Sequence, residues 1–313
     1  MDGPFRDLFI FVGLIVLLFI VWVATGGPER AESGIRTSDR GSNPSTISRD
    51  VRDVARDVDD IEKRIAELKI EGIASPYRDL ISFSGGNPGN DLAIREYVRI
   101  RASSRLTSPV NITGWRVESL LTEHFGTIPS GTPLPFAGVV NSESPIFLAP
   151  GEMVIIVSSR SPLGVSFREN LCTGYLDQVS RFTPALSNRC PDPDDEFKKY
   201  SNYEPESPRD EKFDQCVRYV RRIDRCEVVR DDIRSHGESN ISGVVFPLAN
   251  ECATFIENNL TYQGCVRNHL NKSNFYQREW RVFLGSFVEL WRKDHEVLRL
   301  LDATGRVVDV WQY

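Results

Sequence analysis

The sequence lacks the short motifs that mark common catalytic sites. A G-x-S-x-G elbow, a phosphate-binding P-loop, an H-E-x-x-H metal motif and a G-x-G-x-x-G dinucleotide loop are all absent from its 313 residues. Histidine is scarce, with four residues scattered at positions 124, 236, 269 and 295. We therefore expect no catalytic residues, no cofactor and no metal ion, which excludes the enzyme classes that these motifs define.

The chain also lacks an excess of positive charge. It has 38 lysine and arginine residues against 44 aspartate and glutamate residues, so its formal net charge is -6. A negative protein is not attracted as a whole to nucleic acid or to anionic lipid, and such a role would need a local basic patch. Asp192 to Glu196 form an acidic run, which we interpret as a solvated loop rather than a paired acid and base.

Cysteine is absent from the first half of the chain. The six cysteines all lie in one later stretch: Cys172, Cys190, Cys216, Cys226, Cys252 and Cys265. An even number without a C-x-x-C pair is typical of disulfides in an oxidising compartment, and six cysteines allow about 15 pairings that the sequence does not distinguish. Cys265 and His269 have the spacing of two metal ligands, but no second close pair accompanies them, so zinc is the lesser alternative.

Behind a short leader, residues 1–7, the chain has an apolar segment without a charged side chain. As a helix, Leu8 to Ala24 would be about 26 Å long, which is close to the thickness of the apolar layer of a membrane. We interpret residues 8–25 as one transmembrane helix, with a cleaved signal peptide as the alternative. The cysteines favour a body outside the cytoplasm, although the arginines after the segment favour the opposite orientation.

Residues 26–45 are rich in glycine, serine and proline, and are predicted to be a flexible spacer. Apolar residues then recur in a strict four-three alternation: Ile47, Val51, Val54, Val58, Ile61, Ile65 and Leu68. This repeat predicts a short coiled coil over residues 46–71, through which the protein would form a homo-oligomer. β-branched residues at both core positions favour more than two chains, such as a trimer. The alternative is a helix that packs this stripe on its own domain.

The stretch from Arg95 to Ser119 predicts two β-strands. Val98 and Ile100 alternate with Tyr97, Arg99 and Arg101, which is typical of a half-buried strand. In the second strand the apolar residues change from one face to the other at Gly114, which indicates a bulge. Further strands are predicted at 124–128 and 134–138. The run MVIIV, which follows an Ala-Pro-Gly-Glu turn, predicts a central strand.

Five patterns follow one another along the chain: EYVRIR at Glu96, SPVNITGWRVES at Ser108, IFLAPGEMVII at Ile146, WRVFLG at Trp280 and a closing hairpin at 298–313. In this order they resemble the lamin tail domain. The resemblance implies a mainly β fold, an immunoglobulin-like β-sandwich formed by residues 76–163 and 280–313. It also implies an interaction module without catalytic residues.

Between the two parts of the sandwich, the β pattern stops after Ser158 for more than a hundred residues. Phe213, Cys216, Val217 and Val220 share one helical face, and Cys252, Phe255 and Ile256 share another. A cysteine on each buried face makes disulfides between helices plausible. We therefore expect residues 164–279 to form a largely helical insertion that disulfides hold together.

One possible binding face stands out, formed by Arg95, Tyr97, Arg99 and Arg101. Arginines interleaved with a ring can bind phosphate and stack bases, but an ordinary solvated face has the same pattern, and the negative net charge of the chain disfavours nucleic acid as a partner. We predict a membrane-anchored, extracytoplasmic binding or scaffolding protein that displays a lamin tail domain to envelope proteins or surface polymers. The alternatives are a cell-envelope hydrolase with its site in the insertion and a surface nucleic-acid-binding protein.

Overall fold

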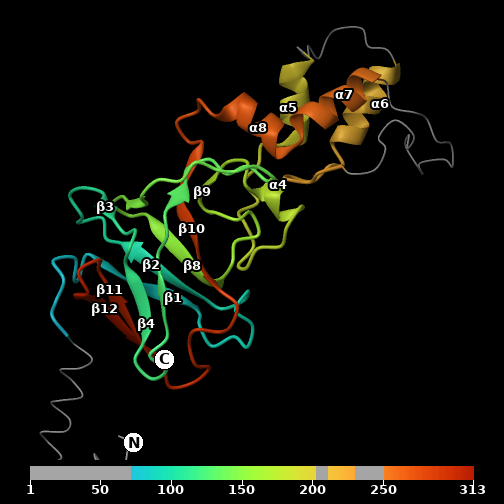
Figure 1. Ribbon diagram of the computed structural model, residues 1–313. Coiled ribbons are helices and arrows are strands. Elements are labelled where there is room, and N and C mark those ends of the chain that lie inside the picture. Colours follow the sequence, from blue (N-terminus) through green and yellow to red (C-terminus); the bar gives the residue numbers. More distant parts are fainter. Residues whose placement is uncertain (1–71, 202–210, 230–249) are drawn as a thin grey trace, which may run out of the picture. The chain divides into compact units, whose positions relative to one another are not determined.

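The computed structural model describes residues 72–201, 211–229 and 250–313 (Figure 1). All of them belong to the second of two compact units, Ala66–Tyr313. This part of the chain is mainly β, with several sheets and few helices. The predicted membrane helix (8–25), spacer (26–45) and coiled coil (46–71) lie outside the described residues and stay predictions. Within the described ranges, no helix combines the length and the apolar composition that crossing a membrane requires.

The larger sheet has six strands. In spatial order they are β1 (Ile81–Asn87), β2 (Tyr97–Ala102), β8 (Met153–Ser159), β10 (Tyr276–Ser286), β9 (Ser166–Asn170) and β6 (Gly131–Thr132). Strand β8 runs antiparallel to β2 and parallel to β10, so strands separated by residues 160–275 lie side by side (Figure 1). The MVIIV run is therefore confirmed as a central strand.

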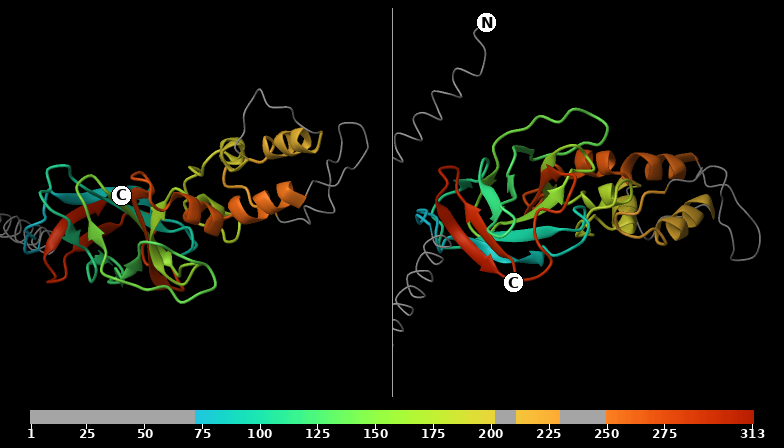
Figure 2. Two further views of the ribbon diagram at one scale, coloured as in Figure 1. Left: turned by 90° about the horizontal axis from the view of Figure 1, so that it is seen from above. Right: turned by 60° about the horizontal axis from the view of Figure 1, so that its bottom comes forward.

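A second sheet has four strands. In spatial order they are β12 (Val307–Gln312), β11 (Val297–Leu301), β4 (Arg116–Ser119) and β5 (Phe125–Thr127). The predicted closing hairpin is β11 and β12, and Gly305 near the end of its turn has the positive φ of +81° that glycine tolerates. Strand β12 lies beside β1, where the backbone N–H of Phe83 donates to Asp309 at 2.7 Å (Figure 2).

The two sheets share one apolar core. It contains Val98 and Ile100 of β2, Val154 and Ile156 of β8, Leu298 and Leu300 of β11, and Trp115 and Val117 at β4. Successive side chains of a strand point to opposite faces, so the remaining residues of β2 and β8 face away from this core. The outer face of the larger sheet is therefore free to build a second layer or a site.

On that outer face Ile155 and Val157 of β8 are also buried. They belong to a second apolar cluster with residues of β9, β10, the short helix α4 (Gly174–Asp177) and α8 (Tyr262–His269). A strand that is covered on both faces needs apolar residues on both, which explains the unbroken run from Val154 to Val157.

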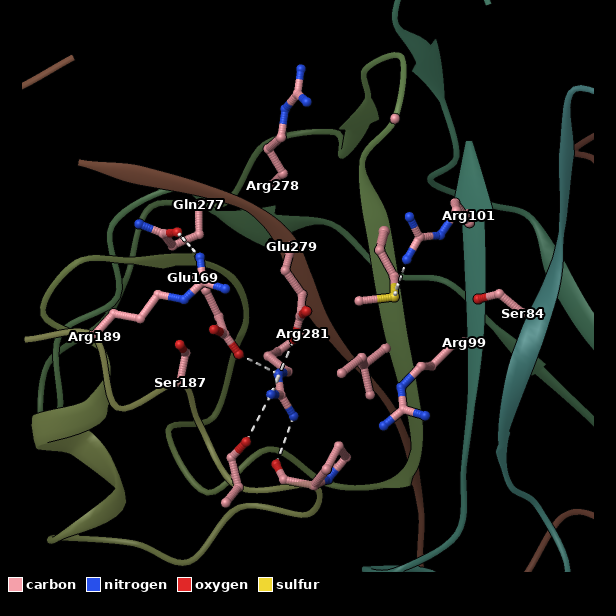
Figure 3. A pocket seen from close by; sticks show the side chains of 15 residues that line it. Ser84, Arg99, Arg101, Glu169, Ser187, Arg189, Gln277, Arg278, Glu279 and Arg281 are labelled. Carbon is pink, nitrogen blue, oxygen red and sulfur yellow. Dashed lines mark hydrogen bonds and ion pairs between the residues drawn. The ribbon is translucent and has the colours of Figure 1, made fainter. Parts of the chain in front are cut away.

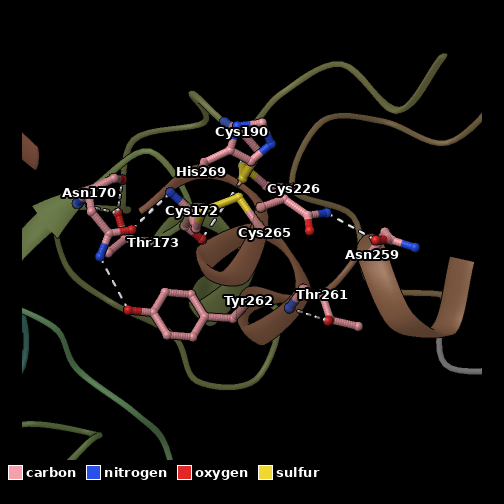
Figure 4. The surroundings of a disulfide bond; sticks show 12 residues. Asn170, Cys172, Thr173, Cys190, Cys226, Asn259, Thr261, Tyr262, Cys265 and His269 are labelled. Atoms are coloured by element: carbon pink, nitrogen blue, oxygen red, sulfur yellow. Dashed lines mark hydrogen bonds between the residues drawn. A yellow bond between two sulfur atoms is a disulfide. The ribbon is translucent and has the colours of Figure 1, made fainter. Parts of the chain in front are cut away.

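The helices α5 (Pro193–Tyr200), α6 (Glu211–Val220) and α7 (Asn250–Asn259) enclose a third apolar cluster. The Cys216–Cys252 disulfide joins α6 to α7 with a Cα–Cα distance of 5.7 Å, so the predicted disulfide between these two helical faces is confirmed. Two further disulfides, Cys172–Cys265 and Cys190–Cys226, lie in the second cluster (Figure 4). The first of them connects the end of β9 to α8.

The expectation that strands stop after Ser158 is wrong at β9, which pairs with β10 inside the larger sheet. Its sequence, SFREN, has no apolar alternation, because Glu169 and Asn170 are buried on polar partners rather than in an apolar core. Strand β10 also begins four residues before the predicted Trp280. The predicted insertion, residues 164–279, therefore includes residues of the larger sheet at both ends, namely β9 and the start of β10.

Two further expectations are wrong. Gly114, with φ +85°, lies in a turn that separates β3 (Val110–Asn111) from β4, rather than in a bulge of one strand. Strand β3 pairs instead with β7 (Phe147–Leu148) in a small sheet of its own. Residues 134–138 form no strand, because the Asn141 side chain binds both backbone groups of Phe136 in place of a neighbouring strand.

The acidic run from Asp192 to Glu196 is also not a loop. Asp192 caps α5, accepting a hydrogen bond from the backbone N–H of Asp194 at 3.1 Å, and Pro193 occupies the first helical position. Carboxylates in the first turn are favoured by the helix dipole, so this cluster of charge stabilises a helix start.

Candidate ligand-binding site

The arginines that were predicted as a binding face lie on the outer face of the larger sheet. In β2, Arg99 and Arg101 alternate with buried aliphatic residues, as expected. Tyr97 lies on the same face, half-buried, with the guanidinium carbon of Arg99 4.9 Å from the centre of its ring. Arg95 lies in a turn before the strand. Of the four predicted residues, only Arg99 and Arg101 line the pocket described next.

A pocket of about 630 Å³ opens on this face (Figure 3). Its charged lining consists of Arg99, Arg101, Arg189, Arg278, Arg281, Glu169 and Glu279. Figure 3 shows Arg99 and Arg101 on one side of the pocket, Arg189 on the opposite side and Arg281 between them. Five arginines against two glutamates give the lining a formal excess of three positive charges, in a protein whose net charge is -6.

The register of the sheet explains how the pocket floor is built. Arg99 of β2 lies beside Ile155 of β8, which in turn lies beside Arg281 of β10. The neighbouring outward row has the same order: Arg101, Met153 and Glu279. Because adjacent strands are about 4.8 Å apart, the backbones that carry these charged residues are separated by about 10 Å. An apolar strip on β8 therefore runs between two charged sides.

Arg281 is a structural residue of this site. Its side chain is only 4% exposed, and its Nε lies 2.6 Å from Oε1 of Glu169. The Nη2 atom lies 3.1 Å from Oε1 of Glu279, and the guanidinium also donates to the carbonyl oxygens of Pro184, at 2.7 Å, and Ala185, at 3.0 Å. These bonds fasten the loop that carries Arg189 to the sheet. They leave Arg281 satisfied without a ligand.

The carboxyl group of Glu169 is the most perturbed acid of the pocket. Burial raises the pKa of Glu169 to about 7, and the neighbouring carboxylate of Glu279 adds to the rise, while the positive charge of Arg281 opposes it. At neutral pH this carboxyl group therefore titrates. When it takes up a proton, the positive excess of the pocket increases by one.

Four arginines of the pocket differ from Arg281, and we refer to them as the rim arginines: Arg99, Arg101, Arg189 and Arg278. Among the described residues, no carboxylate forms an ion pair with any of them. Arg99 donates to the hydroxyl of Tyr97 at 3.3 Å and Arg189 to the side-chain oxygen of Gln277 at 2.8 Å, while Arg101 lies 3.9 Å from the sulfur of Met153. Their charge is thus available to an anion.

A smaller pocket, of about 370 Å³, lies among α5, α7 and α8. Its ionisable pair is His269 and Glu196, with Nε2 2.8 Å from Oε2 and side chains 3% and 11% exposed. Burial raises the pKa of Glu196, but hydrogen bonds from Lys199 and His269 outweigh that effect and leave it below its ordinary value. Both side chains are mostly buried, and their hydrogen bond holds α8 against α5.

Neither sulfur nor histidine forms a metal site in the part of the chain that the structure describes. Cys265, which has the spacing of a metal ligand to His269, is bonded to Cys172 and has no thiolate to offer. The described residues contain no group of three or more potential metal ligands.

Several residues of the pocket were missed by sequence reasoning. The sequence does contain a signal for Glu279 and Arg281, because these charged residues alternate with the apolar Trp280 and Val282 in β10, as charged and apolar residues do in β2. Arg189 had none, since it is exposed in a loop whose position depends on the Cys190–Cys226 disulfide. Glu169 had none either, because its strand shows no apolar period.

Comparisons with known proteins do not assign the chain to a family. No protein-family model matches it, and no curated protein matches it.

Proposed function

We propose that the protein is an extracytoplasmic binding protein anchored in a membrane by its N-terminal helix. A lamin tail domain of the immunoglobulin-like type, displayed on a spacer and a coiled coil, binds envelope proteins or surface polymers that carry negative charge. The observation that supports this best is the set of rim arginines, which have no carboxylate partner among the described residues of an acidic chain. Guanidinium groups bind carboxylates and phosphates through paired hydrogen bonds, so they suit an acidic partner.

The fold supports the proposed family in its main outline. Two sheets around one core suit an immunoglobulin-like sandwich, with residues 76–163 and 280–313 as its two parts and residues 164–279 as an insertion that also supplies β9. The six strands of the larger sheet and the parallel pairing of β8 with β10 depart from the plain form of that fold.

The disulfides support the proposed location. All six cysteines are paired in three bonds, and cytosolic proteins seldom keep disulfides because the compartment is reducing. A body outside the cytoplasm also suits binding to envelope components. Several copies held by a coiled coil would bind a repetitive polymer with greater avidity than one copy.

The test compares a polyanion with its neutral parent polymer. We expect the full-length protein, purified in detergent, to bind immobilised dextran sulfate and not dextran. The double variant Arg99→Ser/Arg101→Ser should lose at least about tenfold in affinity, since each hydrogen bond to a charged group contributes about 1.5–3 kcal/mol. Surface plasmon resonance measures both values.

The matched control is Arg292→Ser/Arg306→Ser, which removes the same charge at exposed positions outside the pocket. Its affinity should remain near that of the wild type. An equal loss in the control would show that binding follows net charge and not the rim arginines, which would refute the proposed site.

Nucleic acid is the second candidate, favoured by the ring of Tyr97 beside Arg99. This alternative predicts that single-stranded DNA binds more tightly than dextran sulfate. Its affinity should fall steeply with salt and should be lost in Arg99→Ser/Arg101→Ser. The hydrolase alternative has less support, because the His269–Glu196 pair of the smaller pocket is mostly buried and joins two helices.

A further inference from the structure

The pocket floor distinguishes among acidic ligands. Met153, half-buried, lies between the arginines of β2 and Glu279 of β10, with Ile155 more deeply buried in the next row. A ligand that is charged all along its length, such as a chain of phosphates, has no apolar surface to place on this strip. A sugar ring does, because one of its faces presents mainly C–H groups.

The uncharged polar groups of the lining suit the same kind of ligand. Ser84 lies beside the arginines of β2, while Ser187 and Gln277 lie on the side of Arg189 (Figure 3). Glu279, partly exposed, offers a carboxylate that accepts hydrogen bonds from hydroxyl groups. An anionic ligand without hydroxyl groups has no donor to offer this carboxylate.

The volume also fits. At about 630 Å³ the pocket lies within the range of about 300–1,000 Å³ that is usual for small-molecule sites, and it has the mixture of apolar floor and convergent polar groups that such sites share. It is thus large enough for a short oligosaccharide and does not require a flat macromolecular partner.

We infer that the pocket binds an acidic sugar, with the C–H face of the ring on Met153 and its charged group held by Arg99 and Arg101. Glu279, Ser187 and Gln277 bind the ring hydroxyls, and Arg189 holds a second charged group of a longer ligand. This inference rests on the proposed function, since it specifies the class of the negatively charged partner.

The test uses small soluble probes and the full-length protein in isothermal titration calorimetry. Trigalacturonate and glucose 6-phosphate are acidic sugars that carry a carboxylate and a phosphate, respectively. Triglutamate and tripolyphosphate are acidic without a sugar ring, and maltotriose is a neutral sugar. We expect one or both acidic sugars to bind at least about tenfold more tightly than the other three probes, and the better of the two identifies the charged group.

Two variants of Met153 test the ring contact. Met153→Ser should weaken binding of the acidic sugar by about tenfold, while Met153→Leu, which keeps an apolar floor, should retain it. Arg101→Ser should weaken binding of every acidic probe. Thermal unfolding of each variant reports whether the fold is intact, and rescue by leucine separates a ring contact from a folding defect.

The outcomes separate the inference from the proposed function. If triglutamate or tripolyphosphate binds as tightly as the acidic sugars, or if Met153→Ser binds as well as the wild type, the inference is wrong while binding of anions by the rim arginines stands. If neither dextran sulfate nor any acidic probe binds, the proposed function is wrong as well.

Discussion

Glu169 is a carboxyl group that folding removes from water. Burial raises its pKa from 4.5 to about 7, with Arg281 as its main favourable partner. Between these two pH values the folded protein binds a proton at Glu169 that the unfolded chain has released. The unfolded state therefore binds fewer protons, and the free energy of unfolding decreases as the pH rises through this window.

The variant Glu169→Gln, which keeps a side-chain oxygen for Arg281 but does not titrate, tests this dependence. We expect the stability of the wild type to decrease relative to that of the variant by up to about 3 kcal/mol between pH 5 and pH 8. Urea unfolding at a series of pH values measures the difference. Parallel stability curves for the two proteins would show that Glu169 does not take up a proton on folding.

At the residue scale, the sequence predicted part of the site. The alternation in β2 indicated Arg99 and Arg101, because a strand with one apolar face must turn its other residues outward. The rest depends on contacts between distant parts of the chain. Glu169 and Arg281 meet across 112 residues of sequence, and a single sequence contains no local signal for such a pair.

Among the elements, α6 and α7 depend most on a covalent link. Each has ten residues, which is too short for an isolated helix to be stable in water. Their shared cluster includes Phe197 of α5, whose ring centre lies 5.0 Å from that of Phe255. The Cys216–Cys252 bond links the two helices within this cluster.

Removing this bond should loosen the helices and leave the sheets intact. For Cys216→Ser/Cys252→Ser we expect a loss of about 2–4 kcal/mol in the local stability of α5, α6 and α7. Hydrogen exchange read by mass spectrometry should show faster exchange there and unchanged protection in β8 and β10.

The matched control is Cys172→Ser/Cys265→Ser, which removes a bond next to β9. It should increase exchange in β9 and α8 instead. If both variants increased exchange equally throughout the described residues, the helices and the sheets would unfold as one unit, contrary to this expectation.

At the scale of elements, prediction succeeded where an apolar pattern was present. Strand β2, the closing hairpin and the helical faces of α6 and α7 follow from apolar periods, and β8 follows from an unbroken apolar run. Strand β9 and helix α5 lack such a pattern, because their burial or capping uses charged side chains. These are Glu169 in β9 and, in α5, Asp192, which accepts a hydrogen bond from the backbone N–H of Asp194. The order of strands in the larger sheet was not predictable either, since it joins segments on both sides of residues 160–275.

For the whole molecule, the coiled coil predicted over residues 46–71 implies that the protein is a homo-oligomer. We expect light scattering of the full-length protein in detergent to show more than two chains per particle, with three as the simplest case. Val58→Asp/Ile61→Asp places charges in the predicted apolar seam and should yield single chains. It should bind dextran sulfate more weakly through lost avidity, but trigalacturonate unchanged.

Lys63→Asp changes a position outside that seam and serves as the control, which should keep the assembly of the wild type. A wild-type protein of single chains would rule out the coiled coil and favour the alternative, in which this helix packs against its own domain.

The segment from Leu171 to Phe275 leaves and re-enters the larger sheet at neighbouring positions. Asn170 pairs with Tyr276, and the backbone N–H of Leu171 donates to the carbonyl of Phe275 at 2.8 Å. The cost of closing a loop grows only slowly with its length, so the parts of this segment that lie outside the second apolar cluster can change in length at little cost to the strands that frame it. The segment also supplies Ser187 and Arg189 to the pocket. Substitutions in this segment would therefore change which ligand the pocket prefers, while the strands of the larger sheet stay the same.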